Sequence, residues 1–546
     1  MENKPNIILI LADDMGYSDL GCYGSEIRTP NIDSLAEDGI IFSQMYNSAR
    51  CCPSRAALLT GLNPHQAGIG HMVSTFGIQS PLHTGPYQGY LNKNCATIAE
   101  VLRISGYSTY MSGKWHVGGG YDLINEKSWS AGAEGNPIPT QRGFDEFFGI
   151  VAGAANYFHP RTLMKNDTFI DINEDSFYLT DAISDQAVSM INNASQKDNP
   201  FFMHIAYTAP HWPLHALEED IAKYEGTYKQ GWDSLRANRH EELKGKKILD
   251  TQWDISPRNS SSQAWKTSTD KTWEDLRMAV YAAMIDRMDQ GIGKILKKLR
   301  ELNIEDNTIL MFLSDNGGCA EFLAEDSNRP SPSQYSSPTR DGRSINVGNR
   351  KDLRPGPDDT FMSYDLSWAN ASNSPFRLFK RWTHEGGIST PFIINWPNKI
   401  KGAQITHSPT HIIDIATTIY EITGANYPDE MYGQEIKPLE GESFYGAFEN
   451  EKWQRKSPIF WEHEGSRAVR EGEWKLVCEV GSNWEIYNMS EDRTELTNLL
   501  NEEVDRVHRM KAQYRKWSDR CEVLEWPVHQ SKWDPKMIST HAHSSG

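Results

Sequence analysis

The stretch "NIILILADD", residues 6–14, joins five consecutive large aliphatic side chains to two aspartates. A continuous apolar run of this length predicts a strand that is buried on both faces, as in parallel sheets. Asp13 and Asp14 follow at the point where that strand ends. Ligands of open α/β sheets bind beyond the carboxyl ends of the strands. The stretch therefore predicts both a parallel sheet and a polar site at one edge of it.

The same alternation of apolar runs and helical patterns continues over the first three hundred residues. Further strands are predicted at 107–113, 201–208 and 307–314, and amphipathic helices at 97–106 and 272–302. Residues 29–43 begin with turn and cap residues and then predict a short helix followed by a strand. Alternating strands and helices are typical of a mainly parallel α/β sheet covered by helices.

The chain of 546 residues is longer than one hydrophobic core usually holds, so we expect two domains. Residues 1–409 are predicted to form the large α/β domain, with polar loops or insertions near 219–268 and 321–375. After about residue 409 the pattern changes to hairpin-like strands followed by a helix. Residues 410–546 are therefore predicted to form a smaller C-terminal α+β domain that contains an antiparallel sheet.

Composition excludes several classes of protein. The chain is 38% hydrophobic and 11% aromatic, which is ordinary for a globular enzyme and unlike a disordered or fibrous chain. Its net charge is −18, from 55 basic and 73 acidic side chains, so the basic surface that nucleic-acid binding requires is not expected. An anionic substrate would have to be bound by local positive charge, which screening over roughly 10 Å permits.

Cysteine usage and apolar runs bear on the compartment. The seven cysteines are odd in number and scattered, which does not indicate a disulfide framework. We expect no transmembrane span, and the run at 7–12 is too short for the apolar region of a signal peptide. The chain is therefore expected to carry no signal peptide: the protein is periplasmic or secreted if a signal has been removed, and cytoplasmic otherwise.

Polar side chains follow each of the predicted strands. Beyond the first strand they are joined by Lys114, His116, His211, Asp315 and Asn316. If the strands are neighbours in the sheet, these groups converge on one pocket. Lys114 and His116 flank Trp115, and residues two apart on an extended segment point the same way. A cation and a general acid–base would then face the same substrate, although such a triplet is also common in ordinary packing.

Four of these residues offer only oxygen ligands: Asp13, Asp14, Asp315 and Asn316. Hard cations prefer this donor set, whereas zinc would be expected to recruit imidazole or thiolate. Several carboxylates together with an amide carbonyl favour Ca²⁺ over Mg²⁺. The alternative is that these side chains cap helices after the strands, which Asp and Asn do routinely.

Other residues are weaker candidates when taken singly. His211 lies between Pro210 and Pro213, which stiffen its loop, and His215 is interpreted as structural. Lys380 stands in the stretch "NSPFRLFKRWTHEGGISTPFIINWP", residues 373–397, in which a double glycine precedes an apolar run. That glycine pair predicts a tight turn near the site.

The stretch "CCPSRAALLTG", residues 51–61, resembles the signature C-x-P-S-R-x-x-L-x-x-G of the type I sulfatases, in the alkaline-phosphatase-like superfamily. Only Cys51 has proline at +2 and arginine at +4, so Cys52 fills the variable position. The resemblance implies that a formylglycine-generating or anaerobic sulfatase-maturating enzyme oxidises Cys51 to Cα-formylglycine. Its hydrated aldehyde is then the nucleophile, and Arg55 anchors it.

Other blocks extend the resemblance over most of the chain, with the bacterial arylsulfatase branch as the most similar. They include "GKWHVG", "AYTAPHWPLHA", "LSDNGG" and "THEGGISTPFIINWP". The resemblance implies one Ca²⁺ site at the four oxygen-donating residues. It also implies that the sulfate is contacted, or protons are moved, by Lys114, His116, His211 and Lys380. The expected activity is hydrolysis of sulfate monoesters, with a sulfated carbohydrate as natural substrate and aryl sulfates as surrogates.

Two rival functions stay open. The same scaffold supports phosphate or phosphonate ester hydrolysis, which often uses two close metals, whereas ligands for one are counted here. A sulfated-glycan-binding protein without catalysis would show a damaged nucleophile motif or missing ligands, and neither is seen. An unconverted Cys51 would leave a protein that binds the ester without hydrolysing it.

Overall fold

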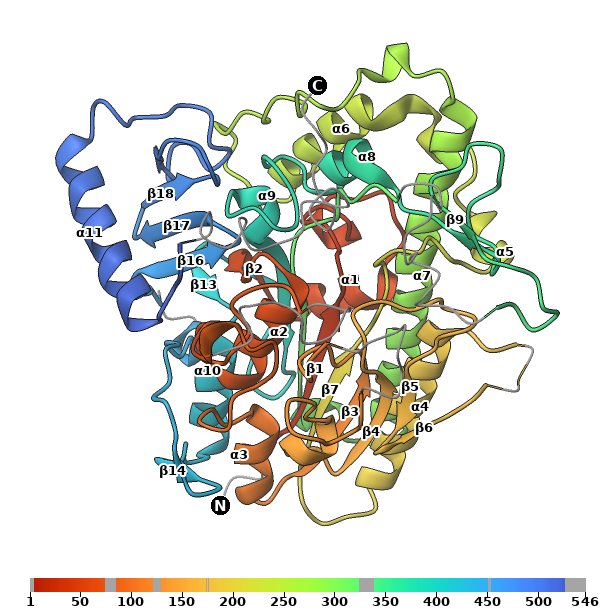
Figure 1. Ribbon diagram of the computed structural model, residues 1–546, viewed down its shortest axis with the longest axis vertical. Helices are drawn as coiled ribbons and strands as arrows, with labels where there is room; N and C mark the ends of the chain where they lie inside the picture. The colour runs from red at the N-terminus through yellow and green to blue at the C-terminus, as the bar shows by residue number, and fades with distance from the viewer. Residues whose placement is uncertain are drawn as a thin grey trace.

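The computed structural model describes residues 4–73, 85–120, 129–172, 174, 176–323, 338–449 and 453–525. A large sheet runs through the middle of the molecule, and a smaller sheet packs beside it (Figure 1). The predicted fold class, a large mixed and mainly parallel sheet with a C-terminal antiparallel sheet, is confirmed.

Within the described residues the large sheet has eleven strands, in the order β12-β2-β11-β8-β1-β7-β3-β4-β5-β6, with β13 paired to β2. Its central strands are parallel, while β11 is antiparallel to both β2 and β8. The strands are β1 (Asn6–Ala12), β2 (Ile40–Tyr46), β3 (Ser108–Gly113), β4 (Glu146–Ile150), β5 (Leu163–Lys165), β6 (Thr168–Phe169), β7 (Phe201–Ala206), β8 (Thr308–Ser314), β11 (Ser389–Asn395), β12 (Gln404–Thr406) and β13 (Thr410–His411).

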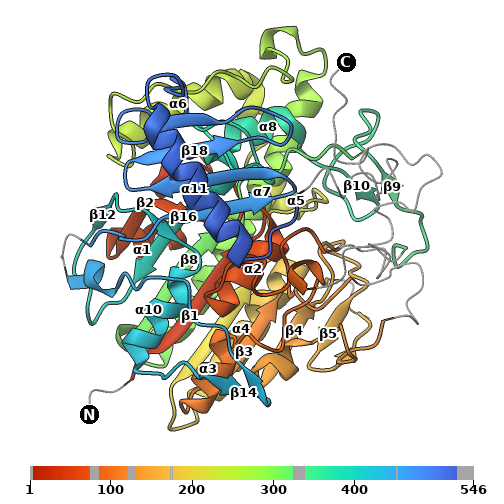
Figure 2. The ribbon, with the colours of Figure 1, turned by 60° about the vertical axis from the view of Figure 1, so that its left-hand side comes forward.

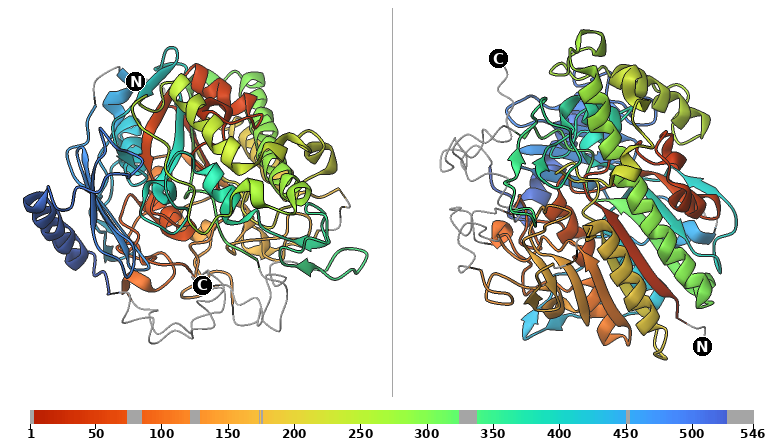
Figure 3. Two further views of the ribbon diagram at one scale, coloured as in Figure 1. Left: turned by 90° about the horizontal axis from the view of Figure 1, so that it is seen from above. Right: turned by 90° about the vertical axis from the view of Figure 1, so that its right-hand side faces the viewer.

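Helices cover both faces of this sheet. One face packs against α1 (Pro30–Glu37), α4 (Leu179–Ala194) and α7 (Lys271–Glu301); the other packs against α2 (Cys51–Thr60), α3 (Ile98–Ile104) and α10 (Asp414–Thr423). The long helix α7 lies beside α4 along the sheet (Figure 3, right).

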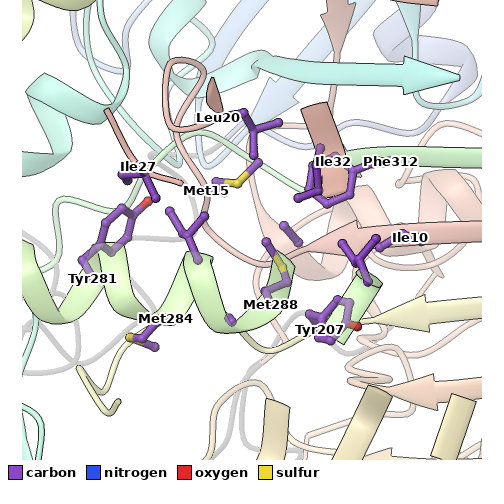
Figure 4. Packing of buried hydrophobic residues seen from close by; sticks show 14 of the residues in the cluster. Ile10, Met15, Leu20, Ile27, Ile32, Tyr207, Tyr281, Met284, Met288 and Phe312 are labelled. Carbon is purple, nitrogen blue, oxygen red and sulfur yellow. The ribbon is translucent and has the colours of Figure 1, made fainter. Parts of the chain in front are cut away.

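The first strand is buried on both sides, as its sequence predicts. Ile8 and Ile10 belong to the core on the α7 side, and Ile7 and Leu9 to the core on the α2 side, because successive side chains of a strand point to opposite faces. Figure 4 shows Ile10 in the first of these cores, together with Met288 of α7.

The second sheet is antiparallel and lies between a helix and the large sheet. Its strands are β16 (Ile459–His463), β17 (Ser466–Glu471), β18 (Trp474–Cys478) and β19 (Glu485–Asn488). One face packs against α11 (Val504–Arg520), which crosses it in Figure 2. The other face packs against Tyr46 of β2 and Ile388.

The change of sheet does not fall at residue 410. Strand β13 pairs with β2 of the large sheet, and α10 packs on α2, so the antiparallel sheet begins only at β16. The division of the chain into two domains stays a prediction. The small hairpin of β14 (Glu430–Met431) and β15 (Gln434–Glu435) lies between these parts in sequence.

The polar insertion at 219–268 is more regular than expected. It contains most of α5 (Glu218–Ile221) and the whole of α6 (Gly231–Gly245), whose Trp232 and Leu235 are buried. The exposed side of α6 is rich in polar residues, so composition alone predicted a loop here and not a helix. In the insertion at 321–375 the structure has β9 (Asn346–Val347), β10 (Thr360–Phe361) and α8 (Asp365–Ser372), while residues 324–337 lie outside the described part.

Candidate active site

Four neighbouring strands deliver the predicted polar residues to one place. In the order β8-β1-β7-β3 all four strands are parallel, so their carboxyl ends lie at the same edge. Two more segments reach that edge: α2, which begins at Cys51, and the loop that carries Lys380 before α9 (Glu385–Ile388). Every predicted site residue is at least 96% buried, and the ten are Asp13, Asp14, Cys51, Arg55, Lys114, His116, His211, Asp315, Asn316 and Lys380.

Arg55 connects three parts of the site. Its guanidinium donates to Oδ2 of Asp315 through Nε at 3.0 Å and through a terminal nitrogen at 2.8 Å. The other terminal nitrogen donates to the backbone oxygen of Lys114 at 2.9 Å. Both of the first two donors converge on one carboxylate oxygen, and such charge-assisted hydrogen bonds are stronger than neutral ones. Arg55 therefore holds the ends of β8 and β3 together, one turn of helix beyond Cys51.

Two lysines pair with the two adjacent aspartates. Lys114 Nζ donates to Asp13 Oδ2 at 2.6 Å, and Lys380 Nζ donates to Asp14 Oδ2 at 2.8 Å. All four side chains are almost fully buried. Each buried carboxylate of the first strand end thus has a cation against it, as a buried charge requires.

His211 lies on the Asp14 side of the site. Its Nε2 is 3.3 Å from Asp14 Oδ2 and 3.4 Å from Lys380 Nζ. Its Nδ1 lies 2.6 Å from the backbone oxygen of Trp212, and Tyr157 Oη donates to the backbone oxygen of His211 at 2.9 Å. These contacts position the imidazole beside the lysine.

His116 lies on the Cys51 side. One of its ring nitrogens is within 4.8 Å of the sulfur atoms of both Cys51 and Cys52. The residue has a φ of 55°, in the left-handed region, and a side chain at Gly153 would meet the imidazole at 2.5 Å. The backbone and the close approach of Gly153 therefore direct this ring toward the cysteines.

Hydrogen bonds link three of the four predicted oxygen donors: Asp14, Asp315 and Asn316. Asn316 Nδ2 donates to Asp14 Oδ1 at 2.7 Å, and the backbone nitrogen of Asp14 donates to Asp315 Oδ1 at 3.2 Å. Asp13 Oδ1 and Asn316 Oδ1 are buried without a hydrogen-bond partner in the described structure. Buried oxygen atoms normally accept a hydrogen bond, and these two do not. A hard cation, which prefers oxygen ligands, would satisfy both. A ligand atom of His211 also lies within 4.8 Å of Asp13 and Asp14.

The buried charges shift several pKa values. Burial raises the pKa of Cys51, but the hydrogen bond with Cys52 and the charge of Lys114 outweigh it, so that pKa lies well below its usual value. Burial lowers the pKa of His116 to about 4 and that of His211 to about 3. Burial opposes the charge on Lys380, but the Asp14 carboxylate raises its pKa well above the usual value.

The structure also separates site residues from structural ones. His215 is structural, as its sequence context indicates: its two ring nitrogens lie 3.3 Å from the Tyr157 amide and 2.6 Å from the Thr360 carbonyl oxygen. Sequence reasoning missed Arg50, which pairs with Glu321 at 2.9 Å directly before Cys51. Its position next to the motif was the one available signal.

Comparison with known proteins identifies the family of this chain. Residues 5–425 match the family model described as Sulfatase. The chain belongs to the sulfatase family. Residues 376–519 of this sulfatase also match the model described as N-sulphoglucosamine sulphohydrolase, C-terminal. The predicted enzyme class, sulfuric ester hydrolase, is confirmed.

Individual relatives span nearly the whole sulfatase. An uncharacterised sulfatase of Schizosaccharomyces pombe is 33% identical over 526 residues, covering 91% of this chain and 90% of its own. The arylsulfatase of Klebsiella aerogenes is 33% identical over 456 residues, covering 81% of this chain and 91% of its own. The crystal structure of Ps i-CgsB in complex with k-i-k-neocarrahexaose is 27% identical with a TM-score of 0.65, covering 94% of this chain and 93% of that one.

Proposed function

We propose that this sulfatase hydrolyses sulfate monoesters of carbohydrates, with small aryl sulfates as surrogate substrates. The observation that carries the proposal is the set of buried basic groups around Cys51, formed by Arg55, Lys114, His116, His211 and Lys380. Such a set suits a small anion in a protein whose net charge is −18. A sugar substrate is supported by the similar Ps i-CgsB, whose structure was solved in complex with k-i-k-neocarrahexaose.

Cys51 is proposed as the residue that a maturing enzyme converts to Cα-formylglycine. The motif C-x-P-S-R is complete here, and Cys51 is the first residue of α2. When present, formylglycine supplies a hydrated aldehyde with two hydroxyls, one as nucleophile and one that allows sulfate to be released. His116, beside Cys51, is the residue placed to accept a proton there.

A single Ca²⁺ is proposed at Asp13, Asp14, Asp315 and Asn316. Their all-oxygen donor set and the two unpartnered acceptors, Asp13 Oδ1 and Asn316 Oδ1, fit a hard cation. When bound, the cation supplies positive charge next to the sulfuryl oxygens and lowers the pKa of a hydroxyl that it contacts.

The remaining residues are proposed to divide between charge and proton transfer. Arg55 and Lys114 hold positive charge against the sulfuryl group, where positioned electrostatics contribute most to rate. Lys380 and His211, 3.4 Å apart, are placed to protonate the leaving alcohol. Some basic groups would thus stabilise the sulfuryl oxygens, and others would act on the leaving group, in an in-line displacement at sulfur.

Phosphonate ester hydrolysis is the second candidate. The phosphonate monoester hydrolase of Agrobacterium radiobacter shares the fold, with a TM-score of 0.54 at 18% identity. That level of identity concerns the fold alone. The oxygen-donating residues here account for one metal, which favours the sulfate ester.

The experiment combines mass spectrometry with an activity assay. The protein is co-expressed with a formylglycine-generating enzyme, and the mass of the peptide that contains Cys51 is measured. Hydrolysis of 4-nitrophenyl sulfate is then followed with and without a calcium chelator. The proposal predicts an aldehyde at Cys51 and chelator-sensitive sulfate release. Hydrolysis of phosphonate or phosphate esters at a higher kcat/KM than that of 4-nitrophenyl sulfate would overturn it, as would an unmodified Cys51 in fully active protein.

Sulfated oligosaccharides test the substrate class separately. Carrageenan and glycosaminoglycan fragments are incubated with the converted enzyme, and free sulfate is measured. The proposal predicts a higher kcat/KM for at least one sulfated sugar than for 4-nitrophenyl sulfate. If aryl sulfates turn over quickly and no sugar releases sulfate, the carbohydrate assignment fails while the sulfatase assignment stands.

A further inference from the structure

Cys52 has no part in the proposed reaction, yet it lies against the residues that do. It occupies the variable position of the motif, its side chain is fully buried, and its thiol donates to the His71 carbonyl oxygen at 3.7 Å. Together with His116, the two cysteines form a cluster of two thiols and one imidazole. This donor set differs in kind from the oxygen-donating residues beside it, because sulfur and nitrogen ligands select thiophilic metals.

The geometry of the cluster suits a tetrahedral metal site. One ligand atom from each of the three residues lies within 4.8 Å of the other two. With Zn–S near 2.3 Å and Zn–N near 2.0–2.1 Å, ligand atoms in a tetrahedral site are about 3.3–3.8 Å apart. Side-chain rotations that shorten these separations by up to about 1–1.5 Å therefore bring the three atoms to coordination distance.

Surrounding contacts already orient the three donors. The backbone nitrogen of Val73 donates to Cys52 Sγ at 3.1 Å, a contact that stabilises a sulfur carrying negative charge. His116 is 98% buried, and among the described residues its ring has no hydrogen-bond partner other than the Cys51 thiol. One nitrogen of this imidazole lies within 4.8 Å of both sulfur atoms, so a single metal ion between them could be bound by all three residues.

Nearby cations do not prevent a metal ion from binding. Lys114 and Lys380 lie close to Cys51, but each is paired with a carboxylate, at 2.6 Å to Asp13 and 2.8 Å to Asp14. Two thiolates neutralise a dication, so the occupied cluster would carry no net charge. Burial of such a site is then compatible with the rule that buried charges are balanced.

We propose that the chain in which Cys51 is still a thiol binds one Zn²⁺ through Cys51 Sγ, Cys52 Sγ and a ring nitrogen of His116. Both sulfurs bind as thiolates, so any proton that they carry is released to solvent, and the fourth position of the metal is left to water. The site belongs to the unconverted chain alone, because conversion of Cys51 removes one of the two sulfur ligands. This restriction rests on the proposed function.

The test uses the full chain produced without a maturing enzyme, with the Cys51 thiol verified by peptide mass. The probes are Zn²⁺, for stoichiometry and affinity, and Co²⁺, whose thiolate charge-transfer absorption reports sulfur ligation. We expect one ion per chain with a two-thiolate spectrum. Loss of a residue that only hydrogen-bonds to a metal ligand typically lowers metal affinity by about 10–100-fold. Cys52→Ser removes a ligand itself, so Zn²⁺ affinity should fall by at least that much.

Cys95→Ser is the matched control, because Cys95 is also buried but bonds to the Asn92 carbonyl oxygen instead of lying in the cluster. It should bind Zn²⁺ as the unchanged chain does, and thermal unfolding verifies that both variants fold. Equal Zn²⁺ affinity in Cys52→Ser and the unchanged chain would overturn the proposal, and so would a Co²⁺ spectrum without thiolate absorption.

Failure of the proposed function leaves a different result. If Cys51 is never converted by a maturing enzyme, the Zn²⁺ titration of the thiol form is unaffected. An Asp14→Asn variant separates the two metals, because it removes charge from the oxygen-donating residues and leaves all three Zn²⁺ ligands in place. Zn²⁺ binding lost in Asp14→Asn and kept in Cys52→Ser would assign the ion to the oxygen donors and reject the proposal.

Discussion

Lys380 is the residue whose role depends most on tertiary structure. Its position after Phe379 in a mixed polar stretch gave little reason to single it out beyond the family resemblance. In the structure it is 97% buried, bonded to Asp14 at 2.8 Å, and 3.4 Å from His211. A lysine brought into a buried site from a distant loop is visible only once the chain is folded.

Replacing Lys380 by alanine should lower kcat/KM for 4-nitrophenyl sulfate by about 10²–10³, the typical cost of one positioned electrostatic contact. Steady-state kinetics measure this effect. Lys401→Ala is the matched control, because Lys401 is exposed and contacts only the Pro397 carbonyl oxygen among the bonds described. Equal losses in the two variants would show that Lys380 acts through general charge and not through its place in the site.

At the scale of elements, the sequence predicted where strands begin and end, but not which strands pair with one another. Strand β1 matches its predicted limits, and β8 begins one residue after its predicted start, because continuous aliphatic runs bounded by polar residues define buried strands. Because β1 and β8 are neighbours in the sheet, the polar residues that follow them lie close together, as predicted. The order of the strands, and the antiparallel insertion of β11 between β2 and β8, depend on pairings across hundreds of residues that local sequence does not encode.

Gly317 shows how tightly two of these elements meet. A side chain there would place its Cβ 1.9 Å from the backbone oxygen of Gly386, in the turn that begins α9. Gly317 also donates its backbone N–H to the Gly387 oxygen at 3.1 Å. The double glycine noted in the sequence therefore lies against the segment that carries Asn316.

Gly317→Ala should destabilise the fold by about 1–3 kcal/mol, the usual cost of overpacking, and should lower activity by displacing Asn316. Denaturant unfolding and the sulfate-release assay measure the two effects. Gly245→Ala provides the comparison, since nothing lies within 4 Å of a side chain at that position. A Gly317→Ala protein as stable and active as the Gly245→Ala protein would contradict this account of the contact.

On the scale of the whole molecule, a buried ionic cluster joins the two sheets. Lys475 of β18 donates to Glu385 and to Glu495, each at 2.8 Å, and Arg493 Nε donates to Glu385 at 3.1 Å. All four side chains are essentially unexposed. Glu385 also accepts from Tyr46 of the large sheet at 3.0 Å, so one carboxylate links both sheets next to the site.

Lys475→Met should lower the free energy of unfolding by about 3–5 kcal/mol, because it leaves two buried carboxylates without their shared cation. Urea unfolding of the purified protein measures the change. Lys516→Met on α11 is the control, since Lys516 is exposed and its loss should change stability by less than about 0.5 kcal/mol. Comparable losses in both variants would show that the cluster does not stabilise the joint between the sheets.

The same cluster predicts how stability depends on pH. Burial raises the pKa of Glu385, but Lys475 and Arg493 outweigh it and lower the pKa to about 2, from an ordinary value of 4.5. A lowered pKa means that the contribution of Glu385 is complete above about pH 4.5 and is lost as the pH falls toward 2. The stability difference between the unchanged chain and Glu385→Gln should therefore shrink between pH 5 and pH 3, as followed by urea unfolding. A difference that stays constant over this range would exclude Glu385 as the titrating group.

The central place of β1 has a consequence for how the chain is made. Its partners β7 and β8 end at residues 206 and 314, so a growing chain adds about 200 residues before β1 has one neighbour and about 300 before it has both. At roughly 5–20 residues per second, the longer interval lasts on the order of 15–60 s. This aliphatic strand is therefore unpaired during a large part of synthesis. Its solubility during synthesis, before any of the final stability exists, sets how much of the protein reaches the folded state.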